Sequence, residues 1–262
     1  MVEAGAVKGG GRTGLFDGNL EFPLGDAGWR AFAARERCGV ESTDDLDALT
    51  MRLIGHEPDL CYLPSASVYF MRGDPVYRGI ASACSARTGK PEQSSVLIVA
   101  RSNPAADWQS LRGARLGYIN TYCTTSYFAP SILLAREGLA LSEFFKAFPV
   151  APWQGQIDAV VAGTIDATMV FEDVWLAGKD NAALTKVIAR LDGLPTPPFL
   201  VRADDGGFAK RLKEQLVTLE AAAGTHPLYS GFSAYEEVRM ASLFAAMAKL
   251  PCLPKLGTGA RT

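Results

Sequence analysis

The sequence has little of what most catalytic and metal centres need. It contains two histidines, His56 and His226, which lie far apart in the chain, so a catalytic centre built on histidine is poorly supported. The five cysteines are odd in number and never have Cys-x-x-Cys spacing, which argues against a zinc site and against a disulfide framework. We therefore expect no metal, no cofactor and no disulfide. The cysteines are Cys38, Cys61, Cys84, Cys123 and Cys252.

An excess of charge of one sign is also missing. The net charge is -2 and no basic cluster occurs, so nucleic acid is not an expected partner. No apolar run approaches the roughly 20 residues that a membrane-spanning helix needs, so no membrane insertion is expected. The start of the chain, MVEAGAVKGGGRTG, lacks the apolar core of a signal peptide. As the sequence stands we expect a cytoplasmic protein; an exported protein whose signal was removed is the alternative.

What the chain does contain is an alternation of apolar strands with amphipathic helices, which is typical of an α/β fold. Strands are expected near residues 58–63, 76–84, 94–101, 116–119, 144–150, 165–171, 184–189 and 199–202. Helices are expected at 29–37, 42–54, from about 126 to 138, at 156–162 and from Phe208 onward. Residues 1–28 are expected to be a glycine-rich tail with at most one strand, near 19–24.

The middle third of the chain forms a βαβ set of its own, bounded by strands at both ends. We expect a smaller lobe of residues 100–198 inserted into a larger lobe of 1–99 plus 199–262, with hinges near Arg101 and Phe199. Each lobe is expected to hold a mixed sheet flanked by helices, and a ligand is expected in the cleft between the lobes. The chain is expected to be a monomer.

Residues 116–138, LGYINTYCTTSYFAPSILLAREG, combine a short apolar strand, a loop rich in hydroxyl groups and a helix. Unpaired backbone N–H groups and the positive end of the helix dipole favour an anion there, and Thr124, Thr125 and Ser126 add hydroxyl donors. Asn120 and Tyr127 flank these donors. The alternative is that serine and threonine only cap the helix, as they do at most helix starts. Cys123 has no base beside it in the sequence and is expected to be a small loop residue.

The run SVLIVARSNPAADWQSLRGARLGYINTYCTTSYFAP, with VVAGTIDATMVFEDVW downstream, resembles the phosphate/phosphonate-type solute-binding proteins of ABC transporters. The resemblance covers about residues 44 to 205 and rests on blocks in the family's order: 59–64 with Tyr69, 99–101, 108–115, 123–126 and 160–167. Two blocks depart from the family's pattern. Thr124-Thr125-Ser126-Tyr127 stands where Ser-Thr-Ser-Gly is usual, and Pro152-Trp153-Gln154 stands where Ser-His is common.

The resemblance implies a two-lobed periplasmic-binding-protein fold of type II and a small anionic solute, with an ABC transporter permease as partner. It also implies a periplasmic location. Aromatic walls are expected from Tyr69, Trp153 and Phe171, each of which would otherwise be core packing. Gln154 is a further candidate contact. Glu172 would take a cation or a protonated oxygen of the solute, or else is a solvated loop acid.

Three functions stay open at this point. The first is a non-catalytic clamp that delivers an anionic solute to a transporter. The second is an enzyme on the same fold, because menaquinone-pathway lyases and thiamine-pyrimidine synthases resemble these clamps. The third is a cytoplasmic sensor of the solute.

Overall fold

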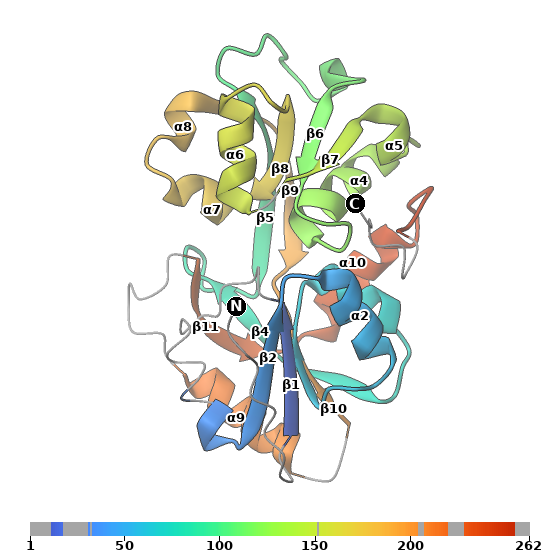
Figure 1. The fold of residues 1–262 in the computed structure, drawn as a ribbon, viewed down its shortest axis with the longest axis vertical. Helices are drawn as coiled ribbons and strands as arrows, with labels where there is room; N and C mark the ends of the chain where they lie inside the picture. The colour runs from blue at the N-terminus through green and yellow to red at the C-terminus, as the bar shows by residue number, and fades with distance from the viewer. Residues whose placement is uncertain are drawn as a thin grey trace. The chain divides into compact units, whose positions relative to one another are not determined.

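The computed structural model describes residues 12–17, 31, 33–150, 152–203, 207–219 and 228–254. The chain divides into two compact units (Figure 1). Unit 1 consists of residues 1–91, 196–237 and 256–262, and unit 2 of residues 92–195 and 238–255. The boundaries that we expected at 99/100 and 198/199 differ from this division. The strand before Arg101 belongs to the sheet of unit 2, and the last helix groups with unit 2 rather than with unit 1.

Unit 1 is built on a six-stranded mixed sheet with the order β11-β4-β10-β3-β1-β2. β1, β2 and β3 run parallel to one another, and β10 lies antiparallel to both β3 and β4. The elements of unit 1 are β1 (Arg12–Asp17), β2 (Cys38–Thr43), α2 (Leu46–Ile54), β3 (Leu60–Tyr62), α3 (Ser65–Val68), the 3₁₀ turn η1 (Tyr69–Met71), β4 (Tyr77–Ser85), β10 (Pro198–Arg202), α9 (Phe208–Thr218) and β11 (Tyr229–Ala234).

Three strands of unit 1 were not predicted. Arg12–Asp17 falls in the expected tail, yet β1 pairs with β2 on one side and β3 on the other. Cys38–Thr43 falls between the two helices expected at 29–37 and 42–54 and overlaps the start of the second. Tyr229–Ala234 falls between the two helical runs expected after Phe208. None of these segments has a strong alternation of its own, so pairing in the sheet decides their conformation. The expected strand at 19–24 and the residues Trp29, Phe32 and His226 lie outside the described residues.

Aromatic packing holds the sheet of unit 1 together. Phe199 on β10 stacks on Tyr62 at 4.8 Å between ring centroids and meets Phe232 of β11 edge-on at 5.4 Å. Both Tyr62 and Phe199 are buried, and each such ring removes a large apolar area from water. The predicted capping signal before α2 is present, because Asp45 accepts a hydrogen bond from the Ala48 amide at 2.9 Å.

Unit 2 has a separate five-stranded sheet with the order β7-β6-β8-β5-β9. β6, β7 and β8 are parallel, whereas β5 is antiparallel to β8 and to β9. The elements are β5 (Glu92–Ala100), η2 (Gln109–Leu111), β6 (Arg115–Tyr118), the π-helical turn η3 (Thr124–Phe128), α4 (Ala129–Ala135), α5 (Leu141–Phe144), β7 (Lys146–Pro149), α6 (Trp153–Val161), β8 (Ala167–Phe171), α7 (Glu172–Ala177), α8 (Asn181–Leu184), β9 (Thr185–Pro195) and α10 (Glu237–Met247).

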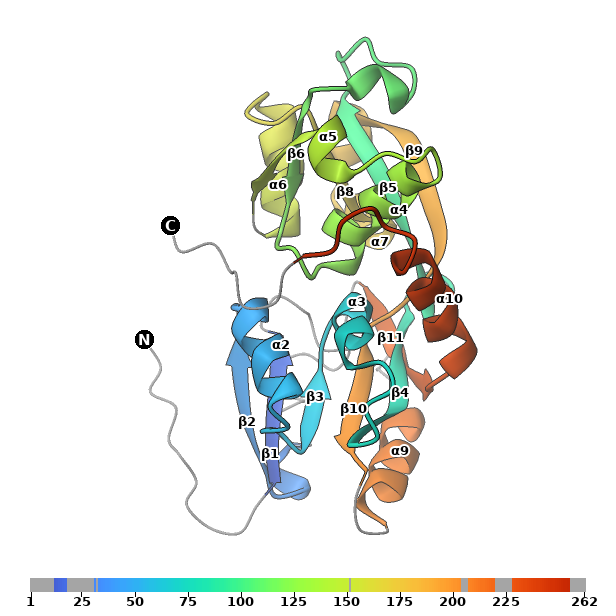
Figure 2. The same ribbon diagram turned by 90° about the vertical axis from the view of Figure 1, so that its right-hand side faces the viewer.

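Helices cover both faces of this sheet. In Figure 1, α6, α7 and α8 lie on one side of the strands and α4 and α5 lie on the other. The core under α6 consists of Val96, Ile98, Ile157 and Val170, which are all buried. β5 was predicted from its continuous apolar run, and its seven central residues are buried because helices lie on both faces. Figure 2 shows the segment after α10 running past α4.

Arg115 and Asp166 clamp the starts of β6 and β8. The Asp166 carboxylate accepts hydrogen bonds from the Arg115 backbone amide at 2.7 Å and from its guanidinium at 2.7 and 3.1 Å. The same guanidinium also donates to Gly163 O at 2.8 Å. Asp166 is the acid of the segment 160–167 on which the family resemblance partly rests. Its contacts show that it sets the spacing of two strands.

Candidate functional site

The parallel strands β6, β7 and β8 end at the same edge of the sheet of unit 2. The segments that follow them are the loop 119–123 with η3, the turn before α6, and the start of α7. β5 begins at this edge too, since Ser95 pairs with Phe171. Open α/β sheets hold ligands at the carboxyl ends of their strands. The structure therefore brings the predicted residues of this unit to one edge: Asn120, Thr124, Thr125, Ser126, Tyr127, Trp153, Gln154 and Glu172.

The hydroxyl-rich run begins the helix instead of preceding it. η3 and α4 form a continuous helical stretch from Thr124 to Ala135, which begins two or three residues before the predicted start at Ser126 or Tyr127. A π-helical turn places one extra residue in the first turn, and such turns occur frequently at functional sites. Thr124, Thr125 and Ser126 are all at least 97% buried.

The hydroxyls of this run differ in what they contact. Ser126 Oγ accepts a hydrogen bond from the Ile119 amide at 3.0 Å, so this side chain ties the loop to the end of β6. Thr125 Oγ1 lies 3.4 Å from Cys123 Sγ, and that sulfur also accepts from the Ser126 amide. Cys123 is thus the N-cap residue, which agrees with its expected role as a small loop residue. Ser126 therefore has a structural role, and contact of Thr124, Thr125 and Ser126 with a ligand stays a prediction.

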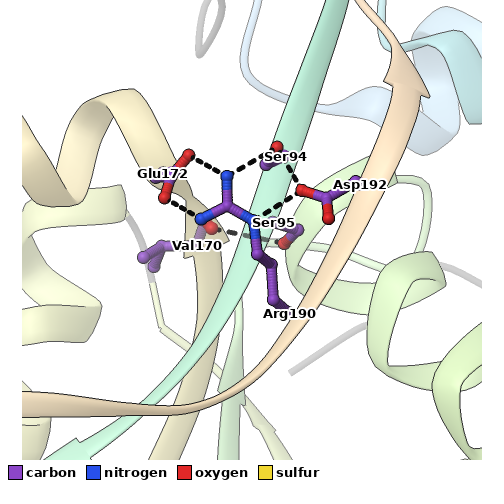
Figure 3. Close-up of polar contacts among 6 residues, drawn as sticks. All are labelled: Ser94, Ser95, Val170, Glu172, Arg190 and Asp192. Atoms are coloured by element: carbon purple, nitrogen blue, oxygen red, sulfur yellow. Dashed lines mark hydrogen bonds and ion pairs between the residues drawn. The ribbon is translucent and has the colours of Figure 1, made fainter.

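Asn120 and Ser95 shape the loop. Asn120 Oδ1 accepts from the Tyr122 amide at 2.9 Å, the geometry of an Asx turn. Ser95 Oγ lies 3.2 Å from both Thr125 O and Val170 O, and so joins the loop to the end of β8. Figure 3 shows the contact between Ser95 and Val170. Asn120 therefore contributes to the backbone turn, and Ser95 is a supporting residue that the sequence did not single out.

Tyr127 packs edge-on against Tyr118 with 5.3 Å between the ring centroids. Burial raises the pKa of both phenols above the ordinary value. Each tyrosine is therefore protonated at neutral pH and remains a hydrogen-bond donor. Cys252 also raises the pKa of Tyr127, because the segment after α10 lies close to this ring. Tyr127 thus supplies a phenol where the family's pattern has glycine.

Trp153 and Gln154 begin α6 but face different surroundings. The Trp153 ring lies 6.5 Å from the buried ring of Phe171, edge to face. Its indole Nε1 is buried and has no hydrogen-bond partner within the described part of the chain. Gln154 is exposed and its amide donates to Asp158 at 2.9 Å and to Asn181 at 3.3 Å. Gln154 therefore stabilises the surface of α6, and contact with a ligand stays a prediction for it.

Glu172 is neutralised by Arg190 (Figure 3). Both carboxylate oxygens accept from the guanidinium, with Nη2 to Oε2 at 2.7 Å. Arg190 donates further to Asp192 at 2.5 Å and to Ser94 at 3.2 Å. The bonds to Glu172, and then to Asp192, raise the pKa of the guanidinium. Glu172 is buried, so it is not the solvated loop acid that was the alternative. Its binding of a solute cation stays an untested prediction.

Tyr69 belongs to unit 1. It is buried, and the Arg72 guanidinium lies over its ring at 3.9 Å from the centroid. Its participation in one site with the residues of unit 2 stays a prediction, as do the cleft and the hinges.

The described residues contain no group of three or more histidine, cysteine or acidic side chains that would hold a metal ion. All five cysteines are free. Burial raises the pKa of the Cys38 thiol to about 11, which makes it a poor nucleophile at neutral pH. No helix within the described ranges is long and apolar enough to cross a membrane.

Two mixed sheets, each with its own helices, define the chain as a protein of the two-lobe periplasmic binding protein fold. The sequence model of the family "ABC transporter, phosphonate, periplasmic substrate-binding protein" matches residues 37–242, and the chain belongs to this family. Among curated proteins no significant sequence match was found.

Solved structures with the same fold include PhnD1 from Prochlorococcus marinus in complex with methylphosphonate. The two sequences are 16% identical, and the structures match with a TM-score of 0.74 over 91% of this chain and 97% of PhnD1. A binding protein component of an ABC phosphonate transporter from Pseudomonas aeruginosa has 13% identity and a TM-score of 0.68 over 90% and 85% of the two chains. The aliphatic sulphonate binding protein SsuA from Escherichia coli has 13% identity and a TM-score of 0.56 over 96% and 94%.

Proposed function

We propose that this chain binds a small solute with a phosphonate-like oxyanion and delivers it to an ABC transporter permease. The observation that carries the proposal is the buried run Thr124-Thr125-Ser126 at the start of a helix, beside the ends of β6 and β8. Helix starts present unpaired N–H groups and a positive dipole end to an anion. Family membership supports the same class of ligand.

In this proposal the oxyanion is held mainly by backbone amides and by the hydroxyls of Thr124 and Thr125. Ser126 holds the loop in shape through its bond with the Ile119 amide. In this proposal the chain carries its solute without transforming it and works on the periplasmic side. The family description, a periplasmic substrate-binding protein of an ABC transporter, supports this. The phosphonate is favoured over other oxyanions by the family match, and the methylphosphonate bound to the relative from Prochlorococcus marinus supports that choice.

The test is isothermal titration calorimetry with methylphosphonate, methanesulfonate and inorganic phosphate, combined with thermal unfolding. A ligand present at 100 times its dissociation constant stabilises the folded chain by about 2.7 kcal/mol, which gives a clear rise in melting temperature. We expect methylphosphonate to bind most tightly of the three. Tighter binding of methanesulfonate would mean that the ligand is a sulfonate and not a phosphonate. The absence of any heat of binding and of any stabilisation would refute the proposal.

A further inference from the structure

Two N–H donors on one face of α6 are buried, and neither has an acceptor in the described ranges. They are the indole Nε1 of Trp153 and the side-chain amide Nε2 of Gln156. The residues are three positions apart in one helix, so their side chains lie on the same face, one turn from each other. Gln156 is 0% exposed. Buried donors are paired in nearly all native proteins, so two unpaired donors on one face of a helix are candidates for bonds to a bound group.

The oxygen of the Gln156 amide faces the sheet. Thr168 Oγ1 donates to Gln156 Oε1 and also lies 3.0 Å from Gly117 O. With its oxygen at Thr168, the amide leaves both hydrogens of Nε2 without an acceptor in the part of the chain that the structure describes.

The place of these donors connects them to the proposed site. Trp153 is the first residue of α6, and its ring packs on Phe171 at the end of β8. The neighbouring acid, Glu172, has both oxygens engaged by Arg190. Gln156 lies one turn further along α6, beside Thr168 near the start of β8. The face of α6 that packs on β8 therefore offers uncharged donors, while the acid that follows β8 is already neutralised. That chemistry suits a hydrogen-bond acceptor on the ligand and does not suit an ammonium group.

We propose that Trp153 and Gln156 bind an acceptor oxygen on the organic part of the solute, such as that of a carboxylate. The site then selects an oxyanion that carries a second acceptor group over one that carries an amine. This inference rests on the proposed function and narrows its substrate class. Gln156 was not singled out from the sequence, where it reads as an ordinary residue of a helix.

The test compares three probes by calorimetry: methylphosphonate, phosphonoacetate and 2-aminoethylphosphonate. We expect phosphonoacetate to bind at least about tenfold more tightly than the other two, the effect of one or two bonds to a charged acceptor. Trp153→Phe and Gln156→Met each remove a donor while keeping most of the side-chain volume. Each should lower the affinity for phosphonoacetate about tenfold and leave that for methylphosphonate nearly unchanged.

The matched control is Trp175→Phe on α7. Its indole Nε1 donates to Thr185 Oγ1 at 2.9 Å, so this substitution removes a paired donor and should lower the melting temperature of the ligand-free protein. Trp153→Phe removes an unpaired donor and should not lower it. Equal losses for methylphosphonate and phosphonoacetate, unchanged affinities in both variants, or a preference for the amine overturn the inference while the proposed function stands. No binding of any probe overturns both.

Discussion

Arg190 on β9 and Glu172 at the start of α7 form a two-pronged ion pair, with Nη2 and Oε2 2.7 Å apart. The side chain of Glu172 is 9% exposed and that of Arg190 is 43% exposed. The charge of Glu172 therefore needs Arg190 beside it, since burial of a carboxylate without a counter-charge costs free energy. The partial exposure of the arginine keeps the net contribution of the pair modest.

We predict that Arg190→Met destabilises the protein by about 1–2 kcal/mol, because Glu172 would lose its counter-charge in a buried setting. The stability of Arg190→Lys should lie between that of the wild type and that of Arg190→Met, since lysine restores the charge but not the two-pronged geometry. Urea unfolding at pH 7 measures both. The double variant with Glu172→Gln is the control and should recover most of the loss. Equal stability of all four proteins would contradict the prediction.

The sequence predicts the elements whose pattern is local. The run from Val96 to Ala100 is apolar throughout, which in an α/β protein indicates a strand covered on both faces. The start of the helix after Cys123 was predicted to within two or three residues because Pro130 is tolerated only near the first turn. By contrast, β1 is stabilised by neighbours from elsewhere in the chain, so its own six residues carry too weak a signal.

The candidate site also has a part that the sequence predicts and a part that it does not. Its hydroxyl run is contiguous and visible in the sequence. The partner of Glu172 is not, because Arg190 lies 18 residues away and reaches it across the intervening strand β5. The unpaired amide of Gln156 is hidden for another reason. Whether a buried donor has a partner depends on the positions of all its neighbours, which no spacing rule supplies.

Asp166→Asn should destabilise unit 2 at neutral pH. Hydrogen bonds from Arg115 lower the pKa of Asp166, so the folded state favours the ionised acid. The stabilisation is fully present above the ordinary aspartate pKa of about 4 and is lost as the pH falls through the lower folded-state value. The gap in melting temperature between wild type and variant should therefore narrow as the pH drops below about 4. A gap that is constant with pH would mean that the charge plays no part.

Gly79→Ala should destabilise unit 1 through a direct clash. A Cβ at this position in β4 would lie 2.4 Å from the ring of Tyr235, closer than van der Waals contact allows. Overpacking of this kind costs about 1–3 kcal/mol. The matched control is Gly39→Ala in β2, where the nearest atom, Arg12 O, is 3.8 Å from the new Cβ. Chemical unfolding of both variants should show a loss for the first and little change for the second; the reverse order would refute the account.

Thr124→Ala and Thr125→Ala should each weaken binding of methylphosphonate about ten- to a hundredfold, the effect of one hydrogen bond to a charged group. Neither change should abolish binding, because the backbone amides at the start of η3 remain. Ser126→Ala should act differently. Its hydroxyl accepts from the Ile119 amide, so its loss should lower stability by about 1 kcal/mol even without ligand.

Calorimetry on the three folded variants, with melting temperatures recorded alongside, separates the two roles of this loop. A loss of affinity at the threonines with little change in stability supports their contact with the anion. Unchanged affinity at both threonines, with lowered stability, means that the hydroxyls only cap their helix, as serine and threonine do in most proteins. The oxyanion would then have to be held by other donors, of which Tyr127 is the nearest in the sequence.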